Sequence, residues 1–406
     1  MDLDKPEKPK IIHPLFRYVA YFSLVDLLIF PYFPLFIMPY SLPVVLTALV
    51  ALGKVRTGKF YLYSVVIASL FMMLSVMTAI ATGKAPEFLR EDFLRVFQFL
   101  TTFLYFFYFY AVAPYLNTKM VKRIMLAAVA YIVLIAIGFL ANPSFLVSLR
   151  QHLYTATAYR LEDVLTHLRF TYIFSDPNTA GYFFLIIILF VLIYFKNTFM
   201  QSMLLLASAI LVTTLTQSVG VTVSLIGVAT IISFKAFVRL DRRFLVKAAE
   251  LVIGLCLLFI FTHFTFPDFT SGVFESADKF VGRAAADPEA LRLETWRYAA
   301  TNFTPFLWGQ GYTLFKADGS LFRPHSDHVR LIYSYGIIAY LIFVVFFFRR
   351  IFRSEYLFLT PAFVAFSVNT LIDEQKLFGL FLVLLALTYA KYRQNGSKLS
   401  MREERY

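Results

Sequence analysis

A polar segment between two hydrophobic stretches in the last third of the chain gathers residue types that do chemistry. From about Ala290 to Gly336 it carries arginines, carboxylates, a glycine turn at Trp308-Gly309-Gln310-Gly311 and the run Pro324-His325-Ser326-Asp327-His328. Guanidinium groups bind phosphate oxygens bidentately, and an imidazole exchanges a proton near neutral pH. The segment therefore predicts the roof of an active site that handles a phosphorylated substrate.

Arginines recur in the two long polar segments that the order of the hydrophobic stretches places on the external side of a membrane, against the usual bias of basic residues towards the cytoplasm. Such a cluster suits a pyrophosphate headgroup whose polyprenyl tail stays in the bilayer. The alternative is that single arginines pair with nearby acids or with anionic lipid headgroups. We favour phosphate binding for the cluster as a whole, whose members are Arg150, Arg160, Arg169, Arg283, Arg292, Arg297, Arg323 and Arg330.

The histidines at positions 325 and 328 allow three interpretations. Histidines three residues apart share a helix face and can bind a metal together with Asp327, but no His-Glu-x-x-His pattern accompanies them, so we predict no metal and no cofactor. His325 can instead have a structural role, by capping the following helix or by hydrogen-bonding its loop. A histidine beside arginines at the mouth of a span can also act as a general base towards a hydroxyl, and we favour this role for His325.

Four further polar residues are candidate contacts for a sugar or for the acceptor of a transferred group. Glu294 and Asp327 lie in the polar segment itself, Asn178 follows a proline at a helix entry, and Gln217 ends a threonine-rich patch. The alternative for each is helix capping or packing within a helix hairpin. We retain all four as candidates.

Ionisable residues also interrupt the apolar stretches at a few places. Asp26 lies inside the first stretch, where an ionisable group is a functional candidate unless a neighbour such as Arg17 neutralises it. The turn Asp373-Glu374-Gln375-Lys376 lies between the last two stretches, and it is an external turn that could reach the cavity. We favour the alternative that it is a solvated loop.

The elements that must position these residues are membrane-spanning helices. Of 406 residues, 59% are hydrophobic and 18% aromatic, and the mean hydropathy is +0.70. These values are typical of polytopic membrane proteins and exclude an ordinary soluble domain. Because each crossing needs about 20 apolar residues, one all-α domain can use the whole chain, 1–406. The polar punctuation predicts about twelve spans, at roughly 15–32, 33–52, 60–82, 93–113, 124–141, 177–195, 202–217, 219–234, 244–262, 328–348, 356–371 and 377–391.

The distribution of charge predicts the topology of these spans. In so apolar a chain the net charge of +13 reports membrane orientation, and we expect no nucleic-acid partner. The basic loops near residues 54–59, 117–123, 235–243 and 349–353, both termini and the tail 392–406 fall on one side, which we predict to be cytoplasmic. The external side receives the loops 83–92, 142–176 and 263–327, the last with an amphipathic helix over about Pro288–Phe303.

Two smaller expectations come from the remaining sequence features. The single cysteine, Cys256, excludes a disulfide within one chain. No small-residue cleavage site follows the first apolar stretch, so we expect no removed signal peptide.

The order of these motifs resembles that of a known family. Arg292-x-x-x-Trp296, then Trp308-Gly309-Gln310-Gly311, then His325-Ser326-Asp327-x-x-Arg330 and Gly336 resemble the signature loop of the O-antigen ligase and polysaccharide polymerase superfamily. The family's second signature is an arginine before a helix entry of the type Asp/Asn-Pro-Asn. Arg169 and Asp176-Pro177-Asn178 match it.

The resemblance implies a fold, an activity and site residues. Members of this family are integral glycosyltransferases of the bacterial inner membrane, all-α and GT-C-like, which act at the periplasmic or outer face. They transfer a glycan from undecaprenyl pyrophosphate to an acceptor hydroxyl without a metal. By this resemblance His325 is the candidate catalytic residue, Arg169 and Arg292 bind the pyrophosphate, and Arg323 and Arg330 are the next candidates.

One departure from the family pattern bears on the acceptor. Where the family often has His-Asn, this chain has His325-Ser326-Asp327-His328, which favours a polymerase of O-antigen, capsule or exopolysaccharide repeat units. Donor and acceptor are then both undecaprenyl-pyrophosphate-linked glycans, and a chain-length regulator is a candidate partner. The nearest alternative is a ligase whose acceptor is lipid A core or a protein. From another class, a transporter or flippase of the same lipids stays open.

Overall fold

The structure is a computed structural model, and it describes only part of the chain. The described residues are 13–30, 38–53, 59–144, 146, 168–174, 176–238, 253, 260, 264, 271, 275, 278, 296–303, 307–316, 318–322, 324, 326–351, 353, 356–368 and 371–403, with backbone alone at 59, 231–238 and 392–403. His325, Arg323, Arg292 and Glu294 lie outside them. Most of the predicted span 244–262 and most of the loop 263–327 before residue 296 also lie outside.

The described part of the chain is almost entirely helical, as the sequence predicts. The helices are α1 (Pro14–Leu28), α2 (Ser41–Leu52), α3 (Lys59–Ala81), α4 (Pro86–Val112), α5 (Thr118–Ala141), α8 (Pro177–Tyr194), α9 (Phe199–Thr216), α10 (Val219–Val238), α14 (Asp327–Arg330), α15 (Ile337–Phe348), α16 (Leu359–Val368) and α17 (Gln375–Glu403). A short antiparallel hairpin joins β1 (Leu314–Phe315) to β2 (Leu321–Phe322).

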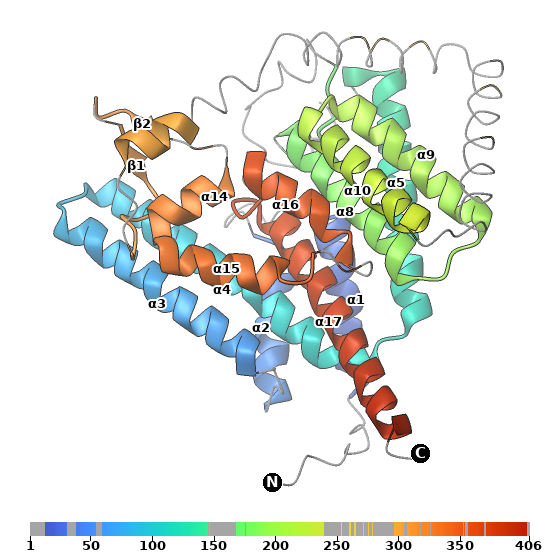
Figure 1. The fold of residues 1–406 in the computed structure, drawn as a ribbon, viewed down its shortest axis with the longest axis horizontal. Coiled ribbons are helices and arrows are strands. Elements are labelled where there is room, and N and C mark those ends of the chain that lie inside the picture. Colours follow the sequence, from blue (N-terminus) through green and yellow to red (C-terminus); the bar gives the residue numbers. More distant parts are fainter. Residues whose placement is uncertain are drawn as a thin grey trace.

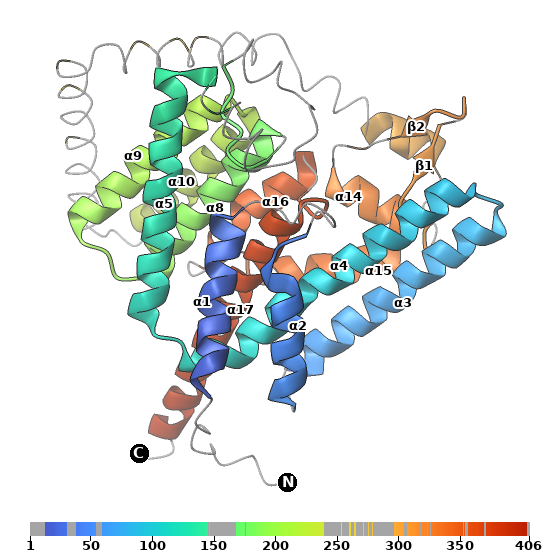
Figure 2. The same ribbon diagram turned by 180° about the vertical axis from the view of Figure 1, so that it is seen from behind.

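Two apolar helices form the centre of the bundle. All described side chains of α17 from Leu377 to Ala390 are buried, and so are nearly all of α8 from Pro177 to Val191. A helix that is apolar on every side belongs in the interior, where other helices cover it. The remaining helices surround these two, with α4 and α1 packed against α17, and α9 and α10 packed against α8 (Figures 1 and 2).

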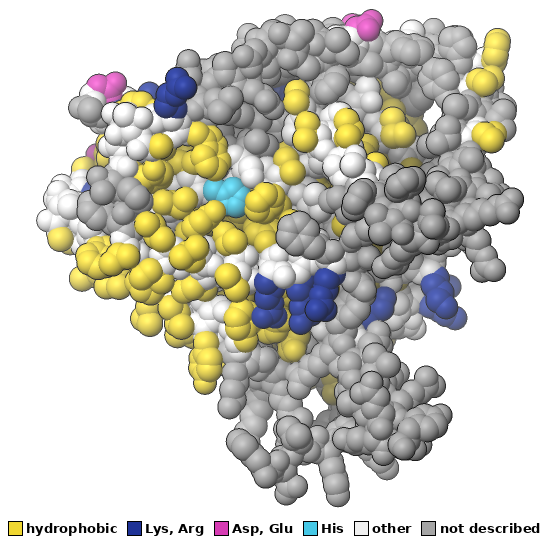
Figure 3. Space-filling model, viewed as in Figure 1, with side chains coloured by type: hydrophobic (Ala, Val, Ile, Leu, Met, Phe, Trp, Pro, Cys, Tyr) yellow, Lys and Arg dark blue, Asp and Glu magenta, His cyan; other side chains and the backbone are white. Residues whose placement is uncertain are grey.

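The outer helices have the surface of a membrane protein. Figure 3 shows hydrophobic side chains over α3 and α15, bordered by a row of basic side chains. Exposed large apolar side chains follow α3 along its whole length, namely Phe60, Leu62, Tyr63, Val66, Ile67, Leu70, Met73, Leu74, Met77 and Ile80. In water such a surface would associate, whereas lipid tails solvate it.

Five helices among the described residues are long and apolar enough to cross a membrane, judged by length and composition. They are Phe60–Ala81, Pro86–Tyr115, Thr118–Ala141, Pro177–Tyr194 and Phe199–Thr216, and shorter apolar helices lie at Ser41–Leu52, Val219–Thr230 and Ile337–Phe348. The prediction of an all-α membrane protein is therefore confirmed. The count of about twelve spans is not.

One predicted span differs from the expected continuous helix. Residues 328–348 form the single turn α14, then a π-helical turn η2 (Leu331–Tyr335), and only then α15. Gly336 separates the last two with φ of +92°, a conformation that residues with a Cβ rarely adopt. The polar segment thus enters the bundle through a broken helix, and π-helical turns are frequent at functional sites.

The loops with basic residues gather at one end of the bundle. Lys122 Nζ donates to the carbonyl of Lys196 at 2.5 Å, and Lys391 Nζ donates to the carbonyl of Tyr194 at 2.8 Å. Arg349 donates to the hydroxyl of Tyr61 at 2.6 Å and lies over the ring of Tyr389. These contacts join the ends of α3, α5, α8, α15 and α17 that the charge pattern assigns to a single side.

Candidate functional site

Three of the predicted site residues come together where α8 begins and α9 ends. Arg169 Nε donates to the carbonyl of Thr216 at 3.1 Å, and its Nη2 donates to Asn178 Oδ1 at 3.3 Å. Gln217 Nε2 donates to the carbonyl of Leu168 at 3.3 Å. We call Arg169, Asn178 and Gln217 the Arg169 group. Arg169 is only 4% exposed.

Local sequence explains why Asn178 faces Arg169. Asp176 caps α8, because its Oδ1 accepts from the backbone N–H of Asn178 at 3.1 Å, and Pro177 occupies the first turn. The same Oδ1 accepts from Asn178 Nδ2 at 3.2 Å. The amide nitrogen of Asn178 is therefore committed to the cap, and its oxygen is left for the guanidinium of Arg169. The predicted capped helix entry is confirmed.

A second group forms around Arg330, at the end of α14. Its Nη1 forms an ion pair with Asp373 and donates to the hydroxyl of Tyr312 at 2.8 Å. Its Nη2 donates to the carbonyl of Pro324 at 3.5 Å. The guanidinium of Arg95, from α4, lies 5.1 Å from the centre of the Tyr312 ring. We call these residues, with Asp327, the Arg330 group.

Asp327 anchors the segment that carries the predicted catalytic histidine. The residue is fully buried, and its Oδ2 accepts from the backbone N–H of Leu371 at 2.6 Å and of Ile372 at 3.2 Å. Its neighbour Ser326 caps α14 and donates to the carbonyl of Phe366 at 3.2 Å. Pro324, on the other side of position 325, accepts a hydrogen bond from Arg330. Hydrogen bonds therefore hold both sequence neighbours of position 325.

The two carboxyl groups of the Arg330 group differ in charge state. Burial by itself would raise the pKa of Asp373, but the guanidiniums of Arg330 and Arg95 outweigh it and hold that pKa below its ordinary value. Burial raises the pKa of Asp327 well above its ordinary value, and the nearby Asp373 carboxylate raises it further. When two carboxyls share a site, the less compensated one keeps the proton. Here that one is Asp327.

A small pocket lies inside the Arg330 group. It has a volume of about 10 Å³, and it is lined by Arg95, Gln98, Phe99, Tyr312, Asp327, Arg330, Leu331, Tyr335, Ile372 and Asp373. Its walls come from α4, from the loop before β1, from α14 and η2, and from the turn before α17. The motif residues Asp327 and Arg330 and the turn at Ile372 and Asp373 therefore line one pocket.

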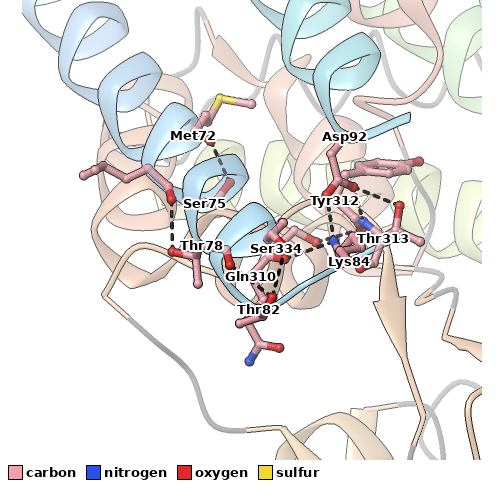
Figure 4. A network of polar contacts seen from close by, with 12 residues as sticks. Met72, Ser75, Thr78, Thr82, Lys84, Asp92, Gln310, Tyr312, Thr313 and Ser334 are labelled. Carbon is pink, nitrogen blue, oxygen red and sulfur yellow. Dashed lines mark hydrogen bonds and ion pairs between the residues drawn. The ribbon is translucent and has the colours of Figure 1, made fainter. Parts of the chain in front are cut away.

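The loop with the glycine turn is held in place by a buried ion pair. Lys84 Nζ lies 2.7 Å from Asp92 Oδ2 and donates to the carbonyls of Gln310 and Thr313 (Figure 4). Asp92 Oδ1 accepts from the backbone N–H of Thr313 at 2.8 Å. A Cβ on Gly311 would lie 2.3 Å from Asp92 Oδ2, so only glycine allows this close approach.

A second buried ion pair joins α1 to the beginning of α17. Lys376 Nζ lies 3.3 Å from Asp26 Oδ1, and both side chains are fully buried. Asp26 Oδ2 accepts from the backbone N–H of Ser41 at 2.7 Å. The predicted partner of Asp26 was Arg17, which lies nine positions earlier and thus about 14 Å away along a helix. The partner is instead Lys376, so the turn at 373–376 is not simply solvated.

Hydrogen bonds place the Arg169 and Arg330 groups at the same end of the bundle. Tyr172, three residues after Arg169, donates its hydroxyl proton to the carbonyl of Leu28 at 2.8 Å. Lys376, three residues after Asp373, donates to the carbonyl of Phe30 at 2.7 Å. The C-terminal end of α1 therefore contacts a residue three positions from a member of each group. This end lies opposite the basic end.

The second histidine of the motif has a packing role. His328 is buried and its ring lies 5.3 Å from that of Phe363, 5.7 Å from that of Tyr340 and 5.9 Å from that of Phe366. Neither ring nitrogen has a hydrogen-bond partner among the described residues. The structural alternative stated for His325 is not tested, because that residue lies outside the described residues.

The sequence reasoning missed Arg95 and its neighbours. Arg95, Glu91 and Gln98 are spaced at four and three residues, so they share one face of α4, and Arg95 Nη1 donates to Gln98 Oε1 at 3.3 Å. We treated Arg95 as part of the span predicted at 93–113. A run of polar residues at helical spacing inside an apolar helix was the signal that could have found this wall of the pocket.

A scan of the chain against models of known protein families gives no match, and neither does a search of curated proteins. The resemblance to O-antigen ligases and polysaccharide polymerases therefore stays a prediction from the motifs. The function has to be inferred from the residues and their geometry.

Proposed function

We propose that the protein is a membrane glycosyltransferase that polymerises oligosaccharide repeat units carried on polyprenyl pyrophosphate. The observation that supports this most is the position of the Arg169 and Arg330 groups at one end of the bundle, where Pro324 and Ser326, the sequence neighbours of His325, are held by hydrogen bonds. Buried, preorganised cations at the mouth of an apolar bundle suit a substrate with a charged head and a lipid tail.

The reaction is a single displacement at the anomeric carbon of the donor sugar. The acceptor hydroxyl oxygen forms the new bond to this carbon, and its proton passes to His325. The bond from the anomeric carbon to the pyrophosphate oxygen breaks, and the electron pair leaves with the pyrophosphate. One displacement inverts the anomeric centre.

The role proposed for Arg169 follows from where negative charge grows. The leaving pyrophosphate gains charge as its bond to the sugar breaks, so a fixed guanidinium stabilises the transition state more than the ground state. Thr216 and Asn178 already hold the Arg169 side chain, so little reorganisation is needed during the reaction. Removing such a fixed donor from an active site typically lowers kcat by roughly 100- to 1,000-fold.

The orientation we propose follows the basic loops. The end that holds Lys122, Lys391 and Arg349 faces the cytoplasm, because basic loops stay on that side. The Arg169 and Arg330 groups then face the external side of a bacterial inner membrane, where lipid-linked repeat units are presented.

A transporter of the same lipids is the second candidate, and the buried pair of Asp26 and Lys376 is the feature that favours it, since ionisable pairs inside the membrane often lie on transport pathways. The pair, however, joins the last turn of α1 (Pro14–Leu28) to the first turn of α17 (Gln375–Glu403). Transporter sites lie near the middle of the bilayer. We therefore rank transport below glycosyl transfer.

Reconstitution distinguishes these activities. Purified protein in liposomes receives polyprenyl-pyrophosphate-linked repeat units as the only substrate, and the products are separated on a gel. A polymerase forms a ladder of lipid-linked glycans and releases one free polyprenyl pyrophosphate for each new link. A ligase releases polyprenyl pyrophosphate only when its separate acceptor is added. A transporter moves the lipid across the bilayer with no release, and that result would contradict the proposal.

A further inference from the structure

Two residues that line the pocket of the Arg330 group each carry a polar atom without a hydrogen-bond partner among the described residues. The atoms are Arg95 Nε and Asp327 Oδ1, and both are buried. Buried polar atoms in folded proteins are nearly always satisfied, by protein, by water or by a ligand. The pair therefore marks the place of a group that binds there.

Arg330, the second cation that lines the pocket, already has an acidic partner. Arg330 is paired with Asp373, donates to the hydroxyl of Tyr312 and donates to the carbonyl of Pro324. Among the described residues, Arg95 donates to the neutral amide of Gln98 at 3.3 Å, and its one ion pair is with Glu91 at 3.9 Å, which does not line the pocket. The positive charge of Arg95 is thus the less compensated of the two.

We propose that Arg95, rather than Arg330, binds a pyrophosphate oxygen of the lipid-linked donor in this pocket, with Asp327 Oδ1 completing the binding site. The inference rests on the proposed function for the identity of the ligand. It transfers to Arg95 the role that the sequence suggested for Arg330, which instead joins Pro324 to Asp373 in the turn before α17.

Size and charge both fit a single anionic oxygen. The volume of about 10 Å³ admits one water-sized group. Asp373 and Arg330 neutralise each other, and burial keeps Asp327 protonated, as its raised pKa indicates. The guanidinium of Arg95 then leaves the pocket with one net positive charge.

Asp327 is preorganised to donate to the same oxygen. Its Oδ2 accepts from the backbone N–H groups of Leu371 and Ile372, so its proton belongs on Oδ1, which has no partner among the described residues. A neutral carboxylic acid kept in an apolar site is a known way to donate a hydrogen bond to a developing anion. Arg95 Nε–H supplies a second donor.

The test uses variants that separate charge, hydrogen bonding and folding. Arg95→Gln removes the cation, and Arg90→Gln is its matched control, because Arg90 is exposed on the same helix. Arg95→Lys restores the charge without Nε. Asp327→Asn offers an amide N–H where the acid offered O–H, and Asp318→Asn is its control, because Asp318 is exposed in the turn of the β-hairpin.

Each purified variant is placed in nanodiscs with polyprenyl pyrophosphate that carries no glycan, and binding is measured together with the melting temperature. We expect roughly 10- to 100-fold weaker binding for Arg95→Gln, as for the loss of a hydrogen bond to a charged group. Arg95→Lys should recover part of it. Asp327→Asn should bind roughly 2- to 10-fold more weakly, because an amide N–H is a weaker donor than an acid O–H. Both controls should bind like the wild type, at unchanged melting temperature.

Three results would overturn the inference. Arg95→Gln could bind the probe like the wild type, in which case the pocket holds only structural water. Asp327→Asn could fold normally and bind the probe more than 10-fold more tightly, which would mean that Asp327 is ionised in the wild type and repels the anion. Wild-type protein could fail to bind the probe. The probe carries no glycan, so binding is measured independently of glycosyl transfer. A protein that binds the probe through Arg95 but transfers no glycan would contradict the proposed function and not this inference.

Discussion

Replacing Lys376 by methionine should lower the free energy of unfolding more than any single substitution on the surface. The side chain of Lys376 is fully buried, and its Nζ donates to the carbonyls of Asp26 at 2.5 Å and Phe30 at 2.7 Å as well as facing Asp26 Oδ1 at 3.3 Å. Methionine has a similar length but no donor, so the substitution removes all three contacts and keeps the packing.

The magnitude follows from what is left behind. Without Lys376 the Asp26 carboxylate is buried with one described donor, the backbone N–H of Ser41, and breaking a buried ion pair by removing one partner costs about 3–5 kcal/mol of unfolding free energy. The double change Asp26→Asn with Lys376→Met leaves no uncompensated charge. It should cost less than Lys376→Met alone, with a coupling energy of about 2 kcal/mol or more.

The assay is unfolding of purified protein by a denaturing detergent in mixed micelles, with the wild type, both single variants and the double variant in one series. Glycosyl transfer should fall with stability in the lysine variant, because the turn that bonds Asp327 lies directly before α17. A double variant that is less stable than the lysine variant would refute the reasoning, since the two residues would then contribute independently.

Three further predictions use the same purified protein. Gly336→Ala should destabilise it by about 2–5 kcal/mol, because the new Cβ would lie 2.3 Å from the carbonyl oxygen of Leu307. The control Gly319→Ala, where φ is also positive but the space is open, should cost only about 1–2 kcal/mol. Equal melting temperatures of the two variants would contradict this prediction. Lys84→Met should release the loop at 310–313 and make it the first site of limited proteolysis; an unchanged cleavage pattern would count against the anchor. The pKa of Asp373 is held below its ordinary value of 3.8, so its stabilising contribution is complete above that pH and is lost as the pH falls through the lowered pKa. The melting temperature of the wild type should therefore exceed that of Asp373→Asn by a constant amount near neutral pH and by less in strong acid, and a difference that grows in acid would contradict the assigned ion pair.

The sequence was sufficient for the class of fold and for part of the site. Composition and apolar run length predicted an all-α membrane protein, because a bilayer accepts few other architectures. The Asp176-Pro177-Asn178 helix entry was predictable from local capping alone, whereas the contact between Asn178 and Arg169 was not. Local rules of this kind need no knowledge of tertiary contacts.

Residue pairs that are distant in sequence and meet only on folding could not be predicted. Asp26 and Lys376 are 350 positions apart, and Lys84 lies 226 positions from Gln310. Nothing in a single sequence reports such pairs. The break at Gly336 was also missed, because residues 328–348 are apolar enough to resemble one span, and the interruption depends on the close approach of the loop at Leu307.

The most direct test of the proposed glycosyl transfer is a replacement of the chromosomal gene by one that encodes His325→Ala, with membrane abundance confirmed and the lipid-linked and surface glycans compared on a gel. If the protein polymerises repeat units with His325 in its active site, single repeats should replace the ladder. A ladder that stays on the polyprenyl carrier but is missing from the final acceptor would make the protein a ligase. An unchanged ladder on the cell surface would contradict the role of His325 and the account built on it.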